Sequence, residues 1–492
     1  MTMSEFNEQK QDYVKSVEGL EEGSQAYAEA LEACHRRGAE RCRKVAEMHR
    51  GLYVKAAQFI ASLRGGTGDR GVPRAYIEAL SAFTDHAPHK PLRDVAPVLR
   101  ECADFGAWPD GPLGDACPLA DIEGEPIASA SLAQVHRATL RDGRRVAVKI
   151  QYPELQKEMA SDFMVFKQMG AQIQSMAQGY DVMWIVEDFE KYLTRELDFA
   201  LEGANGEETG RCLAHLAPAV FVPRVLKDLS SSRVLTMEFC EGLLKVNDPA
   251  GLQKAGLDPL ECADLICATF AEMAFVHGRV HADPHAGNIY LRVREDDLGR
   301  KRPQLVILDH GLYHDLSEND VRRYFCKFWQ ACCSKDHAAM DEIGQRFAGA
   351  LHRFLPMILS PWFVMSGRGA SLEDLRAAAQ GRLPDSVGLR DVADFVVATR
   401  SGGANLIGLL HSLGYVRGLL EALGYPERRR VQCMLRYAVL GDAAGPAAAP
   451  RPLRCGERLW MSWRMNLFHC QVCLTAPVAG FLIRYTGASQ MP

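Results

Sequence analysis

Apolar and polar positions near the start of the chain repeat as they do in an amphipathic helix. Ala, Leu and Met occupy one face of this repeat and Arg, Lys and Glu the other, most clearly over residues 33–48. The pattern predicts helix over residues 5–64. A glycine-rich break at residues 65–68 ends it, and Pro73 marks the start of a second helix.

The pattern changes to strand alternation after Pro126. Residues 126–138 read as a turn of small residues that runs into a strand, and residues 145–150 read as the returning strand. Asp142-Gly143 between them is a hairpin turn signal. A charged helical stretch follows at 154–202, and strand pattern returns at 221–239.

The second half of the chain begins with a predicted helix over residues 257–277. The apolar run 305–308 indicates a buried strand, and the chain beyond Asp315 is helix-rich. This helical part is interrupted at 367–369 and at an Ala- and Pro-rich stretch, 443–450, whose composition is that of a linker.

Composition narrows the class of protein. The chain has 492 residues, 47% of them hydrophobic and 24% charged, as in an ordinary soluble globular protein of two to four domains. A net charge of −5 does not indicate the excess of basic residues that is typical of nucleic-acid-binding proteins. The 15 Cys are scattered, and the CxxC at 470–473 has no partner pair at zinc spacing, so we expect reduced, mostly buried thiols.

Membrane and targeting signals are weak. A spanning helix needs about 18–20 uninterrupted apolar residues, and the nearest stretch, 472–483, is short and broken by Pro477 and Gly480. The acidic, polar start of the chain matches neither a signal peptide nor an Arg-rich transit peptide. Either the protein acts where it is made or its true start lies upstream.

The stretch 279–311 contains the strongest candidate chemistry. Asp283 is followed five residues later by Asn288, the spacing of a kinase catalytic loop in which the Asp serves the attacking hydroxyl and the Asn holds a metal ion. Asp309 ends the apolar run and precedes Gly311 by two residues, which suits a metal-binding carboxylate. Together they predict a magnesium–nucleotide site.

The upstream hairpin supplies the other parts of such a site. The turn Ala128-Ser129-Ala130-Ser131 brings small residues to a place where backbone N–H groups can cradle phosphates. Lys149 in the V-A-V-K strand that follows can reach the α and β phosphates. Glu187, Glu190 and Glu196 are equally good candidates for the acid that pairs with this lysine.

Two further patterns could be functional but also have ordinary structural explanations. His281 and His285 stand four apart like zinc ligands, but Pro284 between them disfavours a shared helical face. Lys55 and Gln58 share one face of the first helix, where on spacing alone they would simply be solvated.

Taken in order, these pieces resemble the UbiB family, also called the aarF-domain-containing kinases. The residues that carry the resemblance are Lys55-Ala-Ala-Gln58, PIASASLAQVHRA at 126–138, VAVKIQYP at 146–153, RELDF at 195–199, HADPHAGN at 281–288 and LDHGLY at 308–313. Asp-His-Gly in place of Asp-Phe-Gly is similar to the mitochondrial branches of the family and their algal or plant relatives.

The resemblance implies an α+β, bilobal protein-kinase-like fold with an N-terminal helical extension and a helical C-terminal region. The expected divisions are an extension over residues 1–100, an N-lobe over 101–240, a C-lobe over 241–400 and a helical region over 401–492.

Site roles follow from the same resemblance. The catalytic set is Asp283, Lys149, Glu196 and Asp198, of which the last two form the family's ExD motif near the lysine of its KxGQ helix. The residues expected to bind nucleotide are Ala128, Ser129, Ala130, Ser131 and Lys149, and those expected to hold the metal are Asn288 and Asp309.

The family's KxGQ motif corresponds here to a regulatory pair, Lys55 and Gln58, on a helix packed over the substrate cleft. In this chain Ala57 occupies the position of the motif's glycine. We expect the added methyl to loosen the extension, and replacement by glycine to tighten it.

The implied activity is that of an atypical kinase or ATPase of the phosphotransferase class, with ATP and Mg²⁺ as cofactors. Small-molecule or lipid phosphorylation linked to ubiquinone or other isoprenoid-lipid metabolism is favoured over protein phosphorylation. The expected partners are an isoprenoid lipid or membrane surface and a protein complex of lipid biosynthesis, in the mitochondrion or a plastid. The alternative is a weakly active pseudokinase that works as a nucleotide-gated binding module.

Overall fold

The computed structural model describes part of the chain in detail. The described residues are 3–21, 24–49, 51–62, 73–80, 89–102, 105, 111, 113–115, 117–130, 132–176, 183–349, 352, 355–359 and 406–443. Several sequence predictions lie outside them: the break at 65–68, Ser131, the interruption at 367–369, the linker residues after 443, the CxxC at 470–473 and the apolar stretch 472–483.

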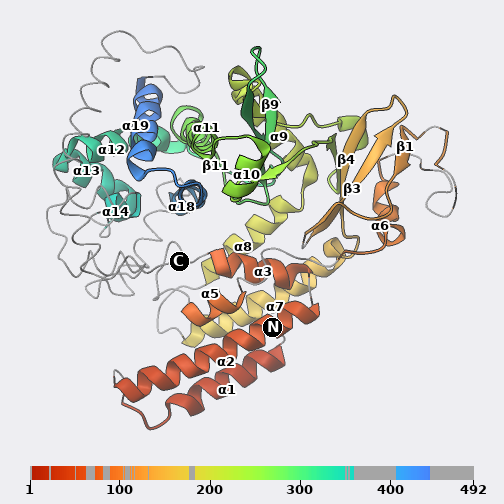
Figure 1. Cartoon of the computed structure of the whole chain (residues 1–492). Coiled ribbons are helices and arrows are strands. Elements are labelled where there is room, and N and C mark those ends of the chain that lie inside the picture. Colours follow the sequence, from red (N-terminus) through yellow and green to blue (C-terminus); the bar gives the residue numbers. More distant parts are fainter. Residues whose placement is uncertain are drawn as a thin grey trace. The chain divides into compact units, whose positions relative to one another are not determined.

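The chain divides into two structural units. The first contains the described residues of Met1–Gly65, Val72–Glu207 and Pro223–Cys240, and the second those of Glu208–Val222 and Glu241–Pro492. Both combine helices with sheet, so the fold is of the α+β class (Figure 1). No helix in the described residues is long and apolar enough to cross a membrane.

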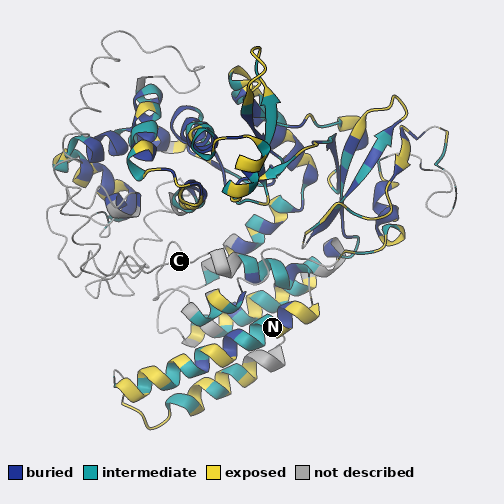
Figure 2. Cartoon of the chain, viewed as in Figure 1, coloured by how far each residue is buried: buried dark blue, intermediate teal, exposed yellow. Residues whose placement is uncertain are grey.

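The first unit begins with the predicted helices. Its helices are α1 (Met3–Val17), α2 (Gln25–His49), α3 (Gly51–Ser62), α5 (Arg74–Leu80), α6 (Leu92–Leu99), α7 (Leu155–Met176), α8 (Met183–Glu196) and the larger part of α9 (Phe199–Cys212). Figure 2 shows exposed positions along α1 and α2, as expected for amphipathic helices. The predicted helix over 5–64 is confirmed as helical structure, but it is divided into three.

The sheet of the first unit runs in the order β1-β3-β4-β6, and β2 pairs with β3. The strands are β1 (Leu119–Ile122), β2 (Ala128–Ser129), β3 (Ala133–Leu140), β4 (Arg145–Gln151) and β6 (Val234–Glu238). The predicted hairpin is present: Gly143 has φ +87°, a conformation that favours glycine, and it closes the turn between β3 and β4.

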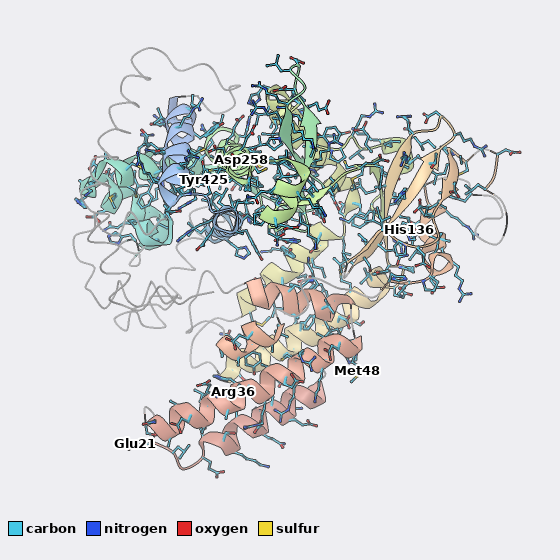
Figure 3. The ribbon with its side chains drawn as sticks, in the orientation of Figure 1. Glu21, Arg36, Met48, His136, Asp258 and Tyr425 are labelled. Carbon is cyan, nitrogen blue, oxygen red and sulfur yellow. The ribbon has the colours of Figure 1, made fainter. Side chains whose placement is uncertain are left out.

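Alternation along β4 decides where Lys149 points. Val146, Val148 and Ile150 are buried in the hydrophobic core, and Lys149 therefore projects from the opposite face of the sheet. His136, labelled in Figure 3, lies on the neighbouring strand β3. Its buried ring bonds the side chain of Gln134 and the carbonyl of Glu123. Gln134 also exchanges hydrogen bonds with the backbone of Lys90, so the buried polar groups of both residues are satisfied.

The second unit contains a sheet of order β5-β10-β9-β7 and a separate pair, β11-β8. The strands are β5 (Val220–Phe221), β7 (Leu244–Lys245), β8 (Arg279–His281), β9 (Ile289–Glu295), β10 (Lys301–Ile307) and β11 (Tyr313–Asp315). Its helices are α10 (Pro249–Ala255), α11 (Pro259–Glu272), α12 (Val321–Ser334), α13 (His337–Ala348), α14 (Leu355–Leu359), α18 (Leu406–Ala422) and α19 (Glu427–Ala443).

Helix α11 positions the segment with the candidate catalytic residues. It begins with Asp258 as N-cap and a proline in its first turn. It continues as a π-helical turn, Met273–His277, and ends at Gly278, whose φ of +67° suits glycine. The core around it is apolar, and α11 and α12 are mostly buried in Figure 2.

Candidate active site

The two predicted metal ligands, Asn288 and Asp309, lie just beyond the neighbouring ends of two adjacent strands. Strands β9 and β10 are antiparallel, and Ile289 faces Ile307 in their register. Beyond that pair the backbone N–H of Leu308 donates to the carbonyl of Asn288 over 3.0 Å. Asn288 therefore immediately precedes β9 beside the point where Asp309 follows β10. The β9–β10 hairpin thus brings together two residues that are twenty-one positions apart in the sequence.

The orientation of both side chains fits a magnesium ion. The amide nitrogen of Asn288 donates to the carbonyl of Asp283 over 2.9 Å, so the amide oxygen is the atom left for a cation. One oxygen of Asp309 accepts from the N–H of Gly311 over 3.0 Å. Mg²⁺ takes oxygen ligands, commonly one or two from protein and the rest from phosphates and water. Within the described residues, no cluster of three or more His, Cys, Asp or Glu side chains forms a metal site by itself.

His281 joins the loop of Asp283 to the segment of Asp309. Its Nε2 lies 2.6 Å from the carbonyl oxygen of Asp309, and its Nδ1 accepts the backbone N–H of Asp283 over 3.1 Å. Burial lowers the pKa of His281, which favours the neutral ring that this pattern needs, with the proton on Nε2. Both ring nitrogens are engaged by backbone, which argues against the zinc alternative.

Asp283 itself is half-buried, and its carboxylate lies 3.6 Å from Nε2 of His285. His285 is turned by its own local bond, since its Nδ1 accepts the N–H of Gly287 over 2.8 Å. The aspartate side chain is thus held on a tight loop with one side open to solvent, as an acceptor of a substrate proton would have to be.

The histidine of the Asp-His-Gly segment is a structural residue. The His310 ring is stacked on Tyr313 with ring centroids 6.0 Å apart, and its Nδ1 lies 2.8 Å from the tyrosine hydroxyl. Its Nε2 lies 3.1 Å from the carbonyl of Ile307. These contacts fix the turn that follows Asp309.

Lys149 pairs with an acid that sequence reasoning missed. Its Nζ lies 2.8 Å from each carboxylate oxygen of Glu202, whose side chain is only 2% exposed. The ammonium also lies 4.9 Å from the centre of the Phe199 ring. Both partners are in α9.

The three acids considered from sequence lie elsewhere. Glu190 pairs with Lys167 on the surface, Glu187 is exposed, and Glu196 pairs with Lys55. A signal for Glu202 was present, because Glu202, Asn205 and Thr209 fall on one face of α9. Only the packing shows that this polar face is buried.

The predicted phosphate loop is a tight backbone turn. Ala128 and Ser129 form β2 against β3, and the N–H of Ala130 donates to the carbonyl of Ala133 over 2.8 Å. The Ser129 hydroxyl lies 3.0 Å from that of Tyr152. Ser131 lies outside the described residues.

The regulatory and acidic motifs meet in the first unit. Lys55 on α3 forms an ion pair with Glu196 at the end of α8, and its Nζ lies 5.4 Å from the ring centre of Tyr192. Gln58, one turn further along α3, is half-buried. Asp198 accepts the N–H groups of residues 200 and 201 over 3.0 and 3.2 Å, so its side chain caps α9.

Ala57 does not behave as its departure from the motif suggested. It is 3% exposed and belongs to an apolar cluster with Ala46 of α2 and Leu80 of α5. The methyl group is therefore packed inside the helical extension. The expectation that it loosens the extension is not supported by this packing, which instead predicts that glycine would leave a void.

Comparison with known proteins places this geometry in context. Residues 85–344 match the model of the ABC1 atypical kinase-like domain. AarF domain-containing protein kinase 1 of Xenopus laevis is 33% identical over 350 residues, which is 71% of this chain and 64% of that protein. The Mus musculus protein of the same name is 34% identical over 339 residues, 69% of this chain and 61% of the relative. The chain thus spans less than two thirds of these relatives.

Among solved structures, the complex of Rv3197 with erythromycin from Mycobacterium tuberculosis is similar. The match covers 81% of this chain and 99% of the Mycobacterium tuberculosis chain, with a TM-score of 0.44 and 19% sequence identity.

Proposed function

Since this chain belongs to the ABC1 atypical kinase-like family, we propose that it binds magnesium–ATP and acts as an ATPase or as a kinase of small molecules or lipids. The observation that carries the proposal is that the β9–β10 hairpin brings Asn288 beside the segment of Asp309. Two oxygen ligands at the neighbouring ends of β9 and β10, tied to the Asp283 loop through His281, suit a magnesium–nucleotide site.

Each side chain has a distinct task in this proposal. Asn288 and Asp309 would hold Mg²⁺, which when bound neutralises charge on the β and γ phosphates. Lys149, held in place by Glu202, contacts the phosphates. Asp283 accepts the proton of the attacking hydroxyl or water at its exposed carboxylate oxygen. The small side chains of Ala128, Ser129 and Ala130 would let the phosphates approach the backbone of this turn closely.

The extension is proposed to regulate access. The ion pair between Lys55 and Glu196 fastens the motif-bearing helix α3 to α8, the helix that leads directly into Asp198 and α9. Gln58 lies on the same helix and is proposed to share this role. An extension fastened in this way would exclude bulky acceptors such as folded proteins, which favours a lipid or small-molecule substrate.

The wider setting belongs to the same proposal. Family resemblance supports a role in ubiquinone or other isoprenoid-lipid metabolism, with a lipid, a membrane surface or a biosynthetic protein complex as partner. It supports a mitochondrial location, or a plastid one in a photosynthetic cell.

The test compares Asp309→Asn with Asp315→Asn. Asp315 is exposed, lies six residues further on and undergoes the same loss of charge, so it is a matched control. Thermal unfolding with and without magnesium–ATP measures binding, because a ligand at 100 times its dissociation constant stabilises the native state by about 2.7 kcal/mol. We expect this stabilisation in the parent and in Asp315→Asn, and its loss in Asp309→Asn.

Turnover is measured on the same proteins as phosphate release, with and without anionic liposomes. Equal stabilisation of all three proteins by magnesium–ATP would refute the metal assignment. Stabilisation of the parent without any turnover would favour the nucleotide-gated binding module over the enzyme.

A further inference from the structure

Helix α18 contacts the segment of Asp283 through a buried serine. The side chain of Ser412 is fully buried, and its hydroxyl donates to the carbonyl of Ala282, the residue before Asp283, over 2.9 Å. The two bonded residues are 130 positions apart in the sequence, and both belong to the second unit. Ser412 lies outside residues 85–344, the part of the chain that matches the family model.

Two carbonyl oxygens lie close to the single hydroxyl proton of Ser412. The second is that of Gly408, one turn earlier in α18, at 3.0 Å. That oxygen also accepts the backbone N–H of Ser412, because each N–H in an α-helix donates to the carbonyl four residues earlier. The carbonyl of Ala282 is buried and lies outside the helices and strands, so the hydroxyl proton stabilises the structure more at this position.

The bond from the serine holds one end of the peptide group that joins Ala282 to Asp283. The other end, the N–H of Asp283, donates to Nδ1 of His281 over 3.1 Å. A peptide group is planar, so bonds at its oxygen and at its N–H together restrict the rotation of the whole plane. On the other side of the Cα, the carbonyl of Asp283 accepts from the Asn288 side chain and from the N–H of His285, each over 2.9 Å. Both peptide groups that flank this Cα are therefore held, and with them the direction of the Cα–Cβ bond.

A glycine allows α18 to lie this close to the active-site segments. A Cβ added at Gly408 would lie 2.2 Å from Cε1 of His314, well inside the contact distance of two carbon atoms. His314 is buried on β11, which follows the turn after Asp309 and pairs with β8. Helix α18 thus packs against the strand that follows Asp309 and bonds the residue that precedes Asp283.

We propose that Ser412 is a positioning residue for Asp283, and that α18 supports the loop that directs this carboxylate towards the substrate. This role rests on the proposed function, in which Asp283 accepts the proton of the attacking group. Ser412 acts only through the backbone of Ala282. Its loss should therefore lower turnover while leaving nucleotide binding, which is assigned to Lys149 and Asp309, unchanged.

The ordinary alternative is a hydroxyl that only bonds its own helix, as that of Ser334 does in α12. The Ser334 hydroxyl lies 2.9 Å from the carbonyl of Gln330, four residues earlier, and 3.3 Å from that of Ala331. Both acceptors belong to the helix that carries the serine. Ser334→Ala therefore removes the same group without touching the Asp283 segment, and it is the matched control for Ser412→Ala.

The experiment measures backbone hydrogen exchange of the full-length protein by mass spectrometry, in the peptide that covers residues 282–288. Loss of the serine bond should make this peptide exchange about five to ten times faster in Ser412→Ala than in the parent. Its exchange in Ser334→Ala, and that of the β9–β10 hairpin in both variants, should stay unchanged. In Ser412→Ala, phosphate release per nucleotide-binding site should fall about tenfold, with KM for ATP unaltered.

A second pair of variants tests the support without removing the hydroxyl. Gly408→Ala places a methyl group against His314 and should speed exchange in residues 282–288 as Ser412→Ala does. Gly418→Ala is its control, because nothing lies within 4 Å of a Cβ added at that position of α18. Both changes raise the helix propensity of α18 alike, so a difference between them reports the packing against His314.

Unchanged exchange of residues 282–288 in Ser412→Ala would overturn the proposal. So would faster exchange with unaltered turnover per site, or equal changes in Ser412→Ala and Ser334→Ala. If exchange rises throughout the second unit, Ser412→Ala has lost its fold; equal exchange of residues 282–288 in Gly408→Ala and Gly418→Ala would then overturn the proposal. Absence of turnover in the parent would refute the proposed enzyme, whereas the support by α18 is judged by exchange alone.

Discussion

Breaking the ion pair between Lys149 and Glu202 should lower the free energy of unfolding substantially. Both Nζ–O distances are 2.8 Å, and the two side chains are 16% and 2% exposed. Removing one member of a buried pair leaves an uncompensated charge and costs about 3–5 kcal/mol. The near-complete burial of Glu202 places Lys149→Met in that range, because an anion remains inside.

Removing the acid instead of the lysine should destabilise the protein less. In Glu202→Gln the remaining ammonium of Lys149 keeps some contact with water, so we expect a loss of about 2 kcal/mol. The double variant removes both charges and should cost less than the sum of the two single changes. The coupling energy should be about 2 kcal/mol or more, well above the error of about 0.5 kcal/mol on such cycles.

The assay is urea denaturation of the four proteins of this cycle. Glu190→Gln is the matched control, because it removes the same kind of charge from the pair with Lys167, whose side chains are 36% and 47% exposed. An exposed pair contributes no more than about 1 kcal/mol. A coupling energy near zero, or equal losses in Glu190→Gln and Glu202→Gln, would refute the reasoning.

Two further predictions concern the helical extension. Ala57→Gly should destabilise the protein by about 1–2 kcal/mol in urea, because glycine weakens a helix interior and the methyl is buried; a gain in stability would contradict the packing with Leu80. Lys55→Ala breaks the ion pair with Glu196 and should raise autophosphorylation, measured by mass spectrometry against the parent; an unchanged level with nucleotide still bound would show that α3 is only packing.

Much of the local structure could be predicted because it depends on neighbours in the sequence. The turn at Asp142-Gly143 follows from the need for a positive φ, and the strand that presents Lys149 follows from alternation of Val146 and Val148. The helices of the extension follow from the period of their apolar positions. Order along the chain was also enough to nominate Asp283, and its role remains a proposal.

Contacts between distant segments could not be read in this way. Many acids in the helical stretch that follows Lys149 have suitable spacing, and the polar face that Glu202 shares with Asn205 and Thr209 does not by itself show which acid is buried. The choice depends on which face of α9 packs against the sheet, and that face was recognisable only after burial was known. The same reason applies to Ala57, whose surroundings come from α2 and α5 rather than from its own helix.

The sequence by itself determined the elements and the kind of chemistry, since turns, periodicity and residue type act over a few positions. Tertiary structure decided which candidates meet. The register of β9 against β10 brings Asn288 beside Asp309, and a buried histidine bonded at both nitrogens ties the Asp283 loop to them. Charges and hydrogen bonds act over a few ångströms in space, and only the folded chain defines those distances.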